Sequence, residues 1–215
     1  MDLFESSKLT FVQNAFLLKG FALANEAAFL TDLTTIISQS PLRHMMTPMG
    51  FAMSAAMTNC GELGWVSDKK GYRYDTLDPN TGAPWPQMPA SFMQLAQSAT
   101  AACGFANFVP DACLINQYKV GASMGLHQDK NELDFTQPIV SISLGIAAVF
   151  QFGGLKRSDK TLKIPLNHGD VVVWGAEARL KFHGILPLKP SKHAAPKNNE
   201  LLGEYRYNLT FRKAG

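Results

Sequence analysis

The sequence predicts a mainly β, α+β domain whose core is a double-sheet jelly roll. Two observations support this class: many short strand-like segments follow Pro110, and two segments with helical periodicity precede them. At 215 residues, with 46% hydrophobic and 17% charged residues, the chain is long enough to bury a full core. We therefore expect residues 1–215 to form one domain.

Two amphipathic helices are predicted. Residues 25–38 place apolar side chains at helical spacing, and Pro41 follows soon after. The second helix begins at Ser91, whose hydroxyl can cap it while Gln94 reaches back in a capping box, and Gly104 suits a left-handed stop. Both helices are expected to pack on the outside of a sheet.

The strand segments show two kinds of pattern. Val140, Ile142 and Leu144 alternate with serines, whereas the run 171–174 is suited to burial on both faces. Eight strands of this kind favour a double-sheet jelly roll. The predicted strands lie near residues 111–119, 123–129, 138–145, 147–152, 161–166, 170–174, 180–186 and 204–212.

Composition divides the chain into further regions. Residues 1–44 are interpreted as an N-terminal extension and helix, and residues 91–215 as a helix plus the jelly-roll core. Residues 45–90 are rich in Met, Gly, Pro, Trp and Tyr, a composition that can fold over a site as an adaptable surface. Residues 189–203, with their Pro, Lys and Asn content, are expected to form an exposed loop.

Charge is unevenly distributed. The net charge is +3, but residues 1–152 carry 8 Lys+Arg against 12 Asp+Glu, and residues 153–215 carry 12 against 5. The C-terminal third is thus +7, which favours a polyanionic partner, although a solvated basic face explains the charge equally well.

Cysteine usage and the N-terminus indicate a cytoplasmic protein. Cys60, Cys103 and Cys113 are odd in number and lack metal-binding spacing, so they are interpreted as reduced thiols. The N-terminus lacks the pattern of a signal peptide, and no stretch is suited to spanning a membrane.

A candidate metal site comes from His127-Gln128-Asp129 and an isolated His183. In a strand, residues i and i+2 project from the same face, roughly 6.6 Å apart, so His127 and Asp129 can approach one ion. His183 must then arrive from a distant strand. Two imidazoles and one carboxylate are the ligand set of non-haem Fe(II) oxygenases, although the H-x-D triplet alone is weak evidence.

The last predicted strand has a polar, basic face. Arg206, Asn208, Thr210 and Arg212 share one side, and the apolar residues between them share the other. The planar fork of Arg206 is suited to a carboxylate, while Arg212 either serves the metal end of a ligand or offsets Asp129. Two exposed strand arginines are the alternative when this strand is viewed in isolation.

Six short strings stand out between about residue 40 and the C-terminus: residues 59–61, 110–116, 126–130, 150–157, 168–175 and 206–212. Together these strings resemble the bacterial AlkB family of oxidative DNA dealkylation enzymes. The resemblance implies a double-stranded β-helix with a nucleotide-recognition lid over residues 45–90. It also implies a requirement for Fe(II), 2-oxoglutarate and O₂.

The resemblance assigns roles by position. The implied iron ligands are His127, Asp129 and His183. The implied 2-oxoglutarate contacts are Asn116, Tyr118, Arg206, Asn208 and Arg212. The implied nucleotide contacts are Met57, Trp65, Tyr72, Asn131 and Arg157. In this assignment His183 sandwiches the methylated base opposite Trp65. Asn131 departs from the family pattern, which usually has a second carboxylate there, so the substrate preference is open.

The implied function is oxidative demethylation of N1-methyladenine and N3-methylcytosine, with release of formaldehyde, succinate and CO₂. Single-stranded DNA is the expected partner of a monomeric enzyme, with double-stranded DNA and RNA left open. One alternative keeps the iron core but hydroxylates a protein or small molecule. Another is a non-catalytic nucleic-acid binder with structural Zn²⁺, although three protein ligands fit an open catalytic site better.

Overall fold

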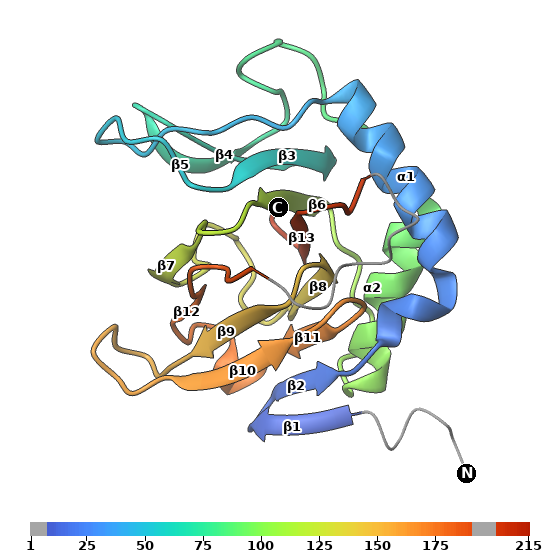
Figure 1. Cartoon of the computed structure of the whole chain (residues 1–215), viewed down its shortest axis with the longest axis vertical. Helices are drawn as coiled ribbons and strands as arrows, with labels where there is room; N and C mark the ends of the chain where they lie inside the picture. Colours follow the sequence, from blue (N-terminus) through green and yellow to red (C-terminus); the bar gives the residue numbers. More distant parts are fainter. Residues whose placement is uncertain (1–7, 191–200) are drawn as a thin grey trace.

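Successive side chains of the larger sheet's strands point alternately toward the helices and toward the smaller sheet, and this alternation produces two hydrophobic clusters. The computed structural model describes residues 8–190 and 201–215. Figure 1 shows two helices along one side of a stack of antiparallel strands. The helices are α1 (Glu26–Gln39) and α2 (Ala90–Ala102). Among the described residues, no helix has the length and apolar character needed to cross a membrane.

The larger sheet has seven strands in the order β1-β2-β11-β8-β13-β6-β3. Neighbouring strands pair antiparallel throughout. Their bounds are β1 (Lys8–Val12), β2 (Ala15–Leu18), β3 (Ala56–Gly61), β6 (Ala112–Tyr118), β8 (Ile139–Gly145), β11 (Val171–Trp174) and β13 (Arg206–Arg212).

The smaller sheet has four antiparallel strands in the order β10-β9-β12-β7. Their bounds are β7 (Met124–His127), β9 (Ala148–Phe152), β10 (Leu162–Leu166) and β12 (His183–Ile185). A separate hairpin pairs β4 (Gly64–Asp68) with β5 (Gly71–Asp75). All eight strands predicted after Pro110 are present, which confirms the jelly-roll prediction.

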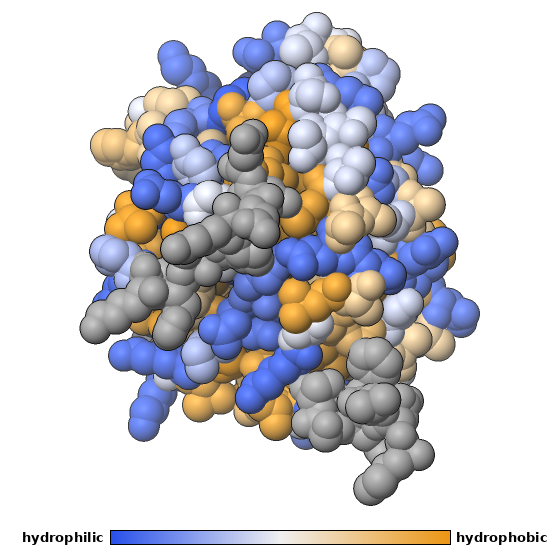
Figure 2. Space-filling view, turned by 45° about the vertical axis from the view of Figure 1, so that its right-hand side comes forward, coloured by the Kyte–Doolittle hydropathy of each residue, from blue (hydrophilic) through white to orange (hydrophobic). Residues whose placement is uncertain are grey.

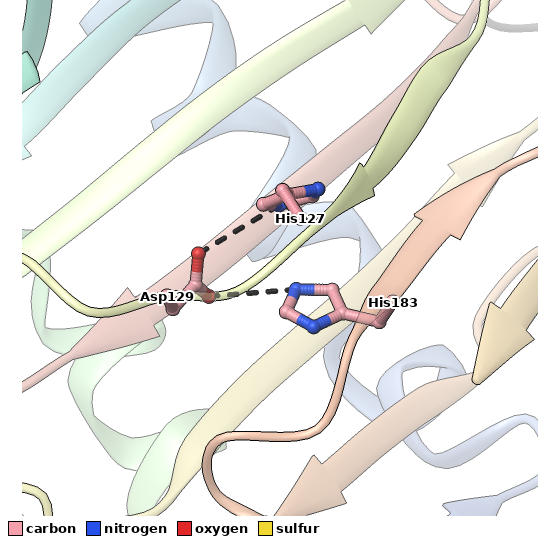
Figure 3. A group of neighbouring side chains, drawn as sticks. All are labelled: His127, Asp129 and His183. Carbon is pink, nitrogen blue, oxygen red and sulfur yellow. Dashed lines mark ion pairs between the residues drawn. The ribbon is translucent and has the colours of Figure 1, made fainter. Parts of the chain in front are cut away.

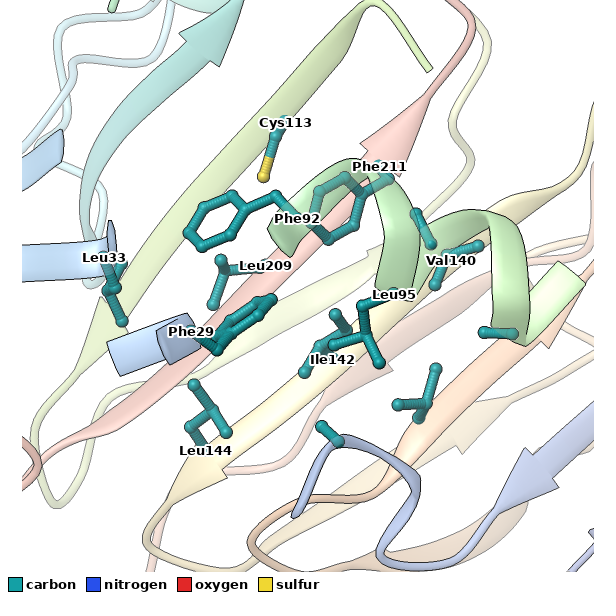
Figure 4. Close-up of a cluster of buried hydrophobic side chains, with 14 of the residues drawn as sticks. Phe29, Leu33, Phe92, Leu95, Cys113, Val140, Ile142, Leu144, Leu209 and Phe211 are labelled. Carbon is teal, nitrogen blue, oxygen red and sulfur yellow. The ribbon is translucent and has the colours of Figure 1, made fainter. Parts of the chain in front are cut away.

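One hydrophobic cluster fills the space between the helices and the outer face of the larger sheet (Figure 4). Phe92 of α2 stacks on Phe29 of α1 with ring centroids 4.3 Å apart, and its edge meets Phe211 of β13 at 6.0 Å. The buried packing of both helices against the sheet confirms their predicted position. Figure 2, which brings this side forward, shows hydrophilic and hydrophobic residues intermixed on the solvent-facing surface.

A second cluster lies between the two sheets, and the same strands supply it from their other face. In β11, Val171 and Val173 join the helix-side cluster, whereas Val172 and Trp174 join the inter-sheet cluster. The run 171–174 is therefore buried on both faces, as its composition predicts.

The N-terminal region differs from the expected extension. Strands β1 and β2 precede α1, and β2 pairs with β11 to extend the larger sheet. Ala15 and Leu17 face the inter-sheet cluster, while Leu18 faces the helices. The short hairpin is integral to the fold because its side chains complete both cores.

Two further expectations are corrected. Strand β3 lies within the expected lid region 45–90 but belongs to the larger sheet, where it pairs with β6. The expected capping box at Ser91 is absent, because α2 begins at Ala90 after Pro89 and the Ser91 hydroxyl donates to Asp32 at 2.5 Å. Gly104 has φ of +84°, so the predicted left-handed stop is confirmed.

The predicted loop 189–203 falls largely outside the described residues, which omit 191–200. At its C-terminal end, Leu202 is fully buried in the helix-side cluster. That end of the segment is therefore anchored in the core rather than exposed.

Replacing Phe92 with alanine should reduce the free energy of unfolding by about 3–5 kcal/mol, since the ring is fully buried between two aromatic neighbours. Urea unfolding followed by circular dichroism measures this change. Phe51→Ala is the matched control, because Phe51 is 66% exposed and its loss should change stability by less than about 1 kcal/mol. Equal losses in the two variants would contradict this packing.

Candidate active site

Two neighbouring strands of the smaller sheet bring the predicted metal ligands together (Figure 3). His127 ends β7 and is the register partner of His183, which begins β12; Asp129 follows two residues after β7 ends. The His127 Nε2 lies 3.7 Å from Asp129 Oδ1, and the His183 Nε2 lies 3.6 Å from Asp129 Oδ2. One potential ligand atom from each residue lies within 4.8 Å of the others, a separation that suits one metal ion.

Backbone packing permits this close pairing. A Cβ on Gly184 would lie 2.6 Å from the Met124 carbonyl oxygen, so glycine beside His183 lets β12 approach β7. The sequence prediction of a third ligand from a distant strand is therefore confirmed. The prediction that β7 itself carries both His127 and Asp129 is wrong by two residues, because the strand ends at His127.

Both imidazoles are held with Nε2 toward the site. The His127 Nδ1 lies 2.9 Å from the Gly125 carbonyl oxygen, and the His183 Nδ1 lies 3.0 Å from that of Lys181. An Nδ1–H that donates to a carbonyl leaves the Nε2 lone pair free for a metal. Burial and the neighbouring His183 lower the pKa of His127 to about 4, so this ring is neutral at pH 7.

Asp129 is kept ionised by a buried arginine. Arg212 donates from Nε and Nη2 to Asp129 Oδ2 at 3.0 and 2.8 Å. Burial alone would raise the pKa of Asp129, but Arg212 and the two histidines outweigh it and hold the pKa well below its ordinary value. The sequence predicts that Arg212 either serves the metal end of a ligand or neutralises the charge of Asp129, and the structure shows the second role.

The polar face of β13 lines a cavity beside the triad. Arg206, Asn208, Thr210 and Arg212 face this cavity, whereas Tyr207, Leu209 and Phe211 pack into the helix-side core. Strand β6 pairs with β13 and adds two of the predicted co-substrate contacts, Asn116 opposite Asn208 and Tyr118 opposite Arg206. The alternative of exposed strand arginines is excluded, because Arg206 is 0% and Arg212 5% exposed.

Arg206 is a buried cation without an anion. Its Nη2 donates to the Ser143 hydroxyl at 3.0 Å, but Nε and Nη1 have no hydrogen-bond partner among the described residues. No carboxylate of residues 8–190 and 201–215 lies within ion-pairing distance of Arg206. Burial lowers the pKa of Arg206, so an anionic ligand would relieve this cost. These orphaned donors fit the far carboxylate of a keto-diacid bound at the metal.

Aromatic side chains of a hairpin reach the segment that follows the metal ligand Asp129. In the β4–β5 hairpin, Trp65 and Tyr72 stack with ring centroids 5.6 Å apart. The Trp65 Nε1 lies 3.4 Å from Asn131 Oδ1, two residues beyond Asp129. Arg157 contacts both ligand strands: it donates to the Leu126 carbonyl of β7, and its guanidinium group lies over the ring of Phe182, which precedes β12. Met57 is fully buried in the inter-sheet cluster, and its register partner in β6 is Asn116.

Several site residues were missed by sequence reasoning. Ser141 and Ser143 support Asn208 and Arg206, and their alternation with apolar residues in β8 was the available signal. The rings of Trp174 and His183 pack with their centroids 4.9 Å apart. The apolar run 171–174 indicated only that Trp174 is buried. Glu132, 5% exposed, carried no sequence signal beyond proximity to Asp129.

A double-sheet jelly roll with two histidines and one carboxylate beside a cavity is the arrangement of a non-haem iron oxygenase, and the buried arginine that lines the cavity suits a keto-acid co-substrate. Comparison with known proteins agrees, since residues 14–212 match the 2OG-Fe(II) oxygenase superfamily. The chain belongs to the AlkB family of α-ketoglutarate-dependent dioxygenases within that superfamily, α-ketoglutarate being 2-oxoglutarate.

The relatives that support this assignment are similar over nearly their full length. The α-ketoglutarate-dependent dioxygenase AlkB of Salmonella typhimurium is 54% identical, covering 93% of this chain and 90% of the relative. AlkB of Escherichia coli is 53% identical, with 94% and 90% covered. The solved structure of OsALKBH1 superposes with a TM-score of 0.81 at 28% identity, covering 96% of this chain and 99% of that one.

Proposed function

We propose that this dioxygenase repairs alkylated nucleic acid by oxidative demethylation of N1-methyladenine and N3-methylcytosine, with single strands preferred. The observation that carries the proposal is the aromatic and amide surface at the segment that follows the metal ligand Asp129. Trp65 contacts Asn131, and Asn131 is two residues from Asp129. A base stacked on this surface would therefore be close to the reactive centre.

When bound, Fe(II), 2-oxoglutarate and O₂ supply an oxidation that hydroxylates the N-methyl group, yielding succinate and CO₂, and formaldehyde is then lost from the base. The chain's own residues position these groups. His127, Asp129 and His183 would hold the metal, and Arg206 would neutralise the far carboxylate of the co-substrate. Asn116, Tyr118 and Asn208 line the same cavity and would complete its hydrogen bonds.

Methylation at these positions makes the base cationic and prevents pairing, so the base leaves the stack easily and is attracted to aromatic faces. Trp65 and Tyr72 supply such faces. The resemblance implies His183 as the partner opposite Trp65, but the exposure of the two histidines supports His127 instead. His183 is only 6% exposed and packs against Trp174, whereas the His127 side chain is 37% exposed. His127 is therefore the better candidate to face the base opposite Trp65.

Positive charge near the site suits a phosphate backbone. Arg157, Lys156 and Lys160 are exposed in the β9–β10 connection, within the C-terminal third that carries a net charge of +7. Contacts of lysine and arginine with phosphates supply sequence-independent affinity. The three cysteines are free and buried, as expected for a protein that works in the cytoplasm. We propose that compartment for this enzyme.

Two other functions use the same residues. A protein or small-molecule hydroxylase would share the triad and Arg206 but has no use for the stacked pair Trp65 and Tyr72. A nucleic-acid binder with structural Zn²⁺ would need a fourth ligand. Among the described residues, the only cluster with metal-binding spacing is His127, Asp129 and His183, which favours an open catalytic site.

The deciding experiment supplies Fe(II), 2-oxoglutarate and ascorbate together with single strands that carry different modified bases. Mass spectrometry of the oligonucleotide and a formaldehyde assay identify the product. We expect loss of one methyl group per formaldehyde released. Succinate formation that is not stimulated by any oligonucleotide would instead favour a protein or small-molecule substrate, and no turnover at all would favour the zinc-binding alternative.

Trp65→Ala should raise the KM for a methylated single strand by about 5- to 150-fold, because base–aromatic stacking contributes about 1–3 kcal/mol. The KM for 2-oxoglutarate should change little, since Trp65 is not among the residues that line the co-substrate cavity. Trp65→Phe is the matched control and should retain most of the affinity. An alanine variant with wild-type KM would show that the base binds elsewhere.

Asn131→Asp should increase the preference for N1-methyladenine over N3-methylcytosine, because it places a negative charge beside a cationic base and its exocyclic amine. Asn131 can accept a hydrogen bond but supplies no charge. The ratio of kcat/KM for the two lesions measures the effect, with an expected change of about 3- to 10-fold. Equal ratios in the two proteins would count against Asn131 as a base contact.

A further inference from the structure

A buried carboxylate, Glu132, lies three residues after Asp129, and its side chain is only 2% exposed. It contacts two arginines. Arg179 Nη2 lies 3.1 Å from Oε2, and Arg212 Nε lies 3.4 Å from Oε1. The Arg179 contact is an ion pair without good hydrogen-bond alignment, since Oε2 has no hydrogen-bond partner among the described residues. Glu132 therefore acts on both arginines mainly through charge.

Both arginines also hold Asp129. Arg212 binds the Asp129 carboxylate through Nε and Nη2, and Arg179 donates from Nη1 to the Asp129 backbone carbonyl at 2.8 Å. One arginine thus fixes the side chain of this predicted metal ligand and the other fixes its backbone. Glu132 therefore pairs with both of the arginines that hold Asp129.

Glu132 also receives a hydrogen bond from the β4–β5 hairpin. The Tyr74 hydroxyl donates to Glu132 Oε1 at 2.7 Å. Burial and the nearby carboxylates raise the pKa of Tyr74 well above its ordinary value, so the hydroxyl remains a donor. Tyr74 is the register partner of Trp65, which itself contacts Asn131. Two opposite residues of the hairpin are therefore tied to the short segment 129–132.

We propose that Tyr74 and Glu132 are positioning residues that couple the hairpin to the metal ligand Asp129. Nucleotide binding at the hairpin and metal binding at the triad should then strengthen each other. The inference rests on the proposed function, because it takes a methylated nucleotide as the hairpin's ligand. Coupling between two sites is reciprocal, so it can be measured from either one.

The test measures the Kd of a methylated single strand for the protein with and without Mn²⁺ plus 2-oxoglutarate, under conditions without turnover. In the wild-type protein the loaded form should bind at least about fivefold more tightly. Tyr74→Phe removes one hydroxyl and should reduce this ratio to below about twofold, with the melting temperature little changed.

Two further variants sharpen the result. Tyr207→Phe is the matched control: its hydroxyl accepts a hydrogen bond from Gln117 Nε2 at 2.6 Å, but its ring packs in the helix-side core, so the ratio should stay at the wild-type value. Glu132→Gln keeps an acceptor for Tyr74 but removes the charge that orients the arginines. It should raise the Kd for Mn²⁺ by about 10- to 100-fold.

The outcomes are distinguishable. If the wild-type protein binds and demethylates the strand but its Kd is the same with and without Mn²⁺, the coupling is absent and the inference is overturned. A ratio that Tyr74→Phe leaves intact, or that Tyr207→Phe lowers equally, also overturns it. If no methylated strand binds the wild-type protein, the proposed function fails first and the coupling fails with it.

Discussion

Asp129→Asn is expected to reduce demethylation by at least about 10³-fold, equivalent to about 4 kcal/mol of transition-state stabilisation. The substitution keeps the size of the side chain but replaces a charged ligand with a neutral amide. The activity should fall because the variant binds the metal more weakly. A Mn²⁺ titration monitored by electron paramagnetic resonance measures this affinity. Asp134→Asn is the matched control, because Asp134 lies outside the triad and hydrogen-bonds with the neighbouring Thr136.

The same variant carries a second, independent effect. Arg212 would lose its principal anion in a buried position, and breaking a buried ion pair costs about 3–5 kcal/mol. We expect the lower end of that range because Glu132 remains 3.4 Å from Arg212 Nε. Urea unfolding of the metal-free variant measures this cost. Unchanged stability together with unchanged Mn²⁺ affinity would show that Asp129 is not held as described.

Arg206→Met is expected to raise the KM for 2-oxoglutarate by at least about 100-fold, which corresponds to about 2.7 kcal/mol. The two free donors of Arg206 would bind the far carboxylate, and charge-assisted pairs of this kind are the strong ones. The KM for the oligonucleotide should change much less. Arg206→Lys should rescue only part of the loss, because an ammonium group lacks the planar fork.

The stability of the Arg206→Met protein should not suffer in the way that its 2-oxoglutarate binding does. Removing a buried, unpaired charge should leave the co-substrate-free protein as stable as before or more stable, since Arg206 has no anion among the described residues. Arg43→Met is the matched control, because Arg43 pairs with the buried Asp78 through two nitrogens and its loss should destabilise. In thermal melts, 2-oxoglutarate should stabilise the wild-type protein but not Arg206→Met. A strongly destabilised Arg206→Met protein would contradict this reading of the cavity.

Much of the core fold was predictable because alternation along a strand reports directly on burial. The serines at 141 and 143, and the polar residues 206, 208, 210 and 212, showed which faces meet the site. The strands β1 to β5 were missed. The side chains of β2 and β3 are buried only because distant strands, β11 for β2 and β6 for β3, lie alongside them.

The linear chain by itself determined the chemistry: two imidazoles, one carboxylate and an arginine suited to a keto-diacid, placed at strand-compatible spacing. Tertiary structure decided which charges are paired. Arg206 lacks an anion and Arg212 has two, although both project from the same face of β13. Tyr74 and Glu132 meet only because β5 lies against the segment that follows β7, where the Tyr74 hydroxyl donates to Glu132. Electrostatic energies depend on distance and burial, which sequence spacing does not fix for residues far apart in the chain.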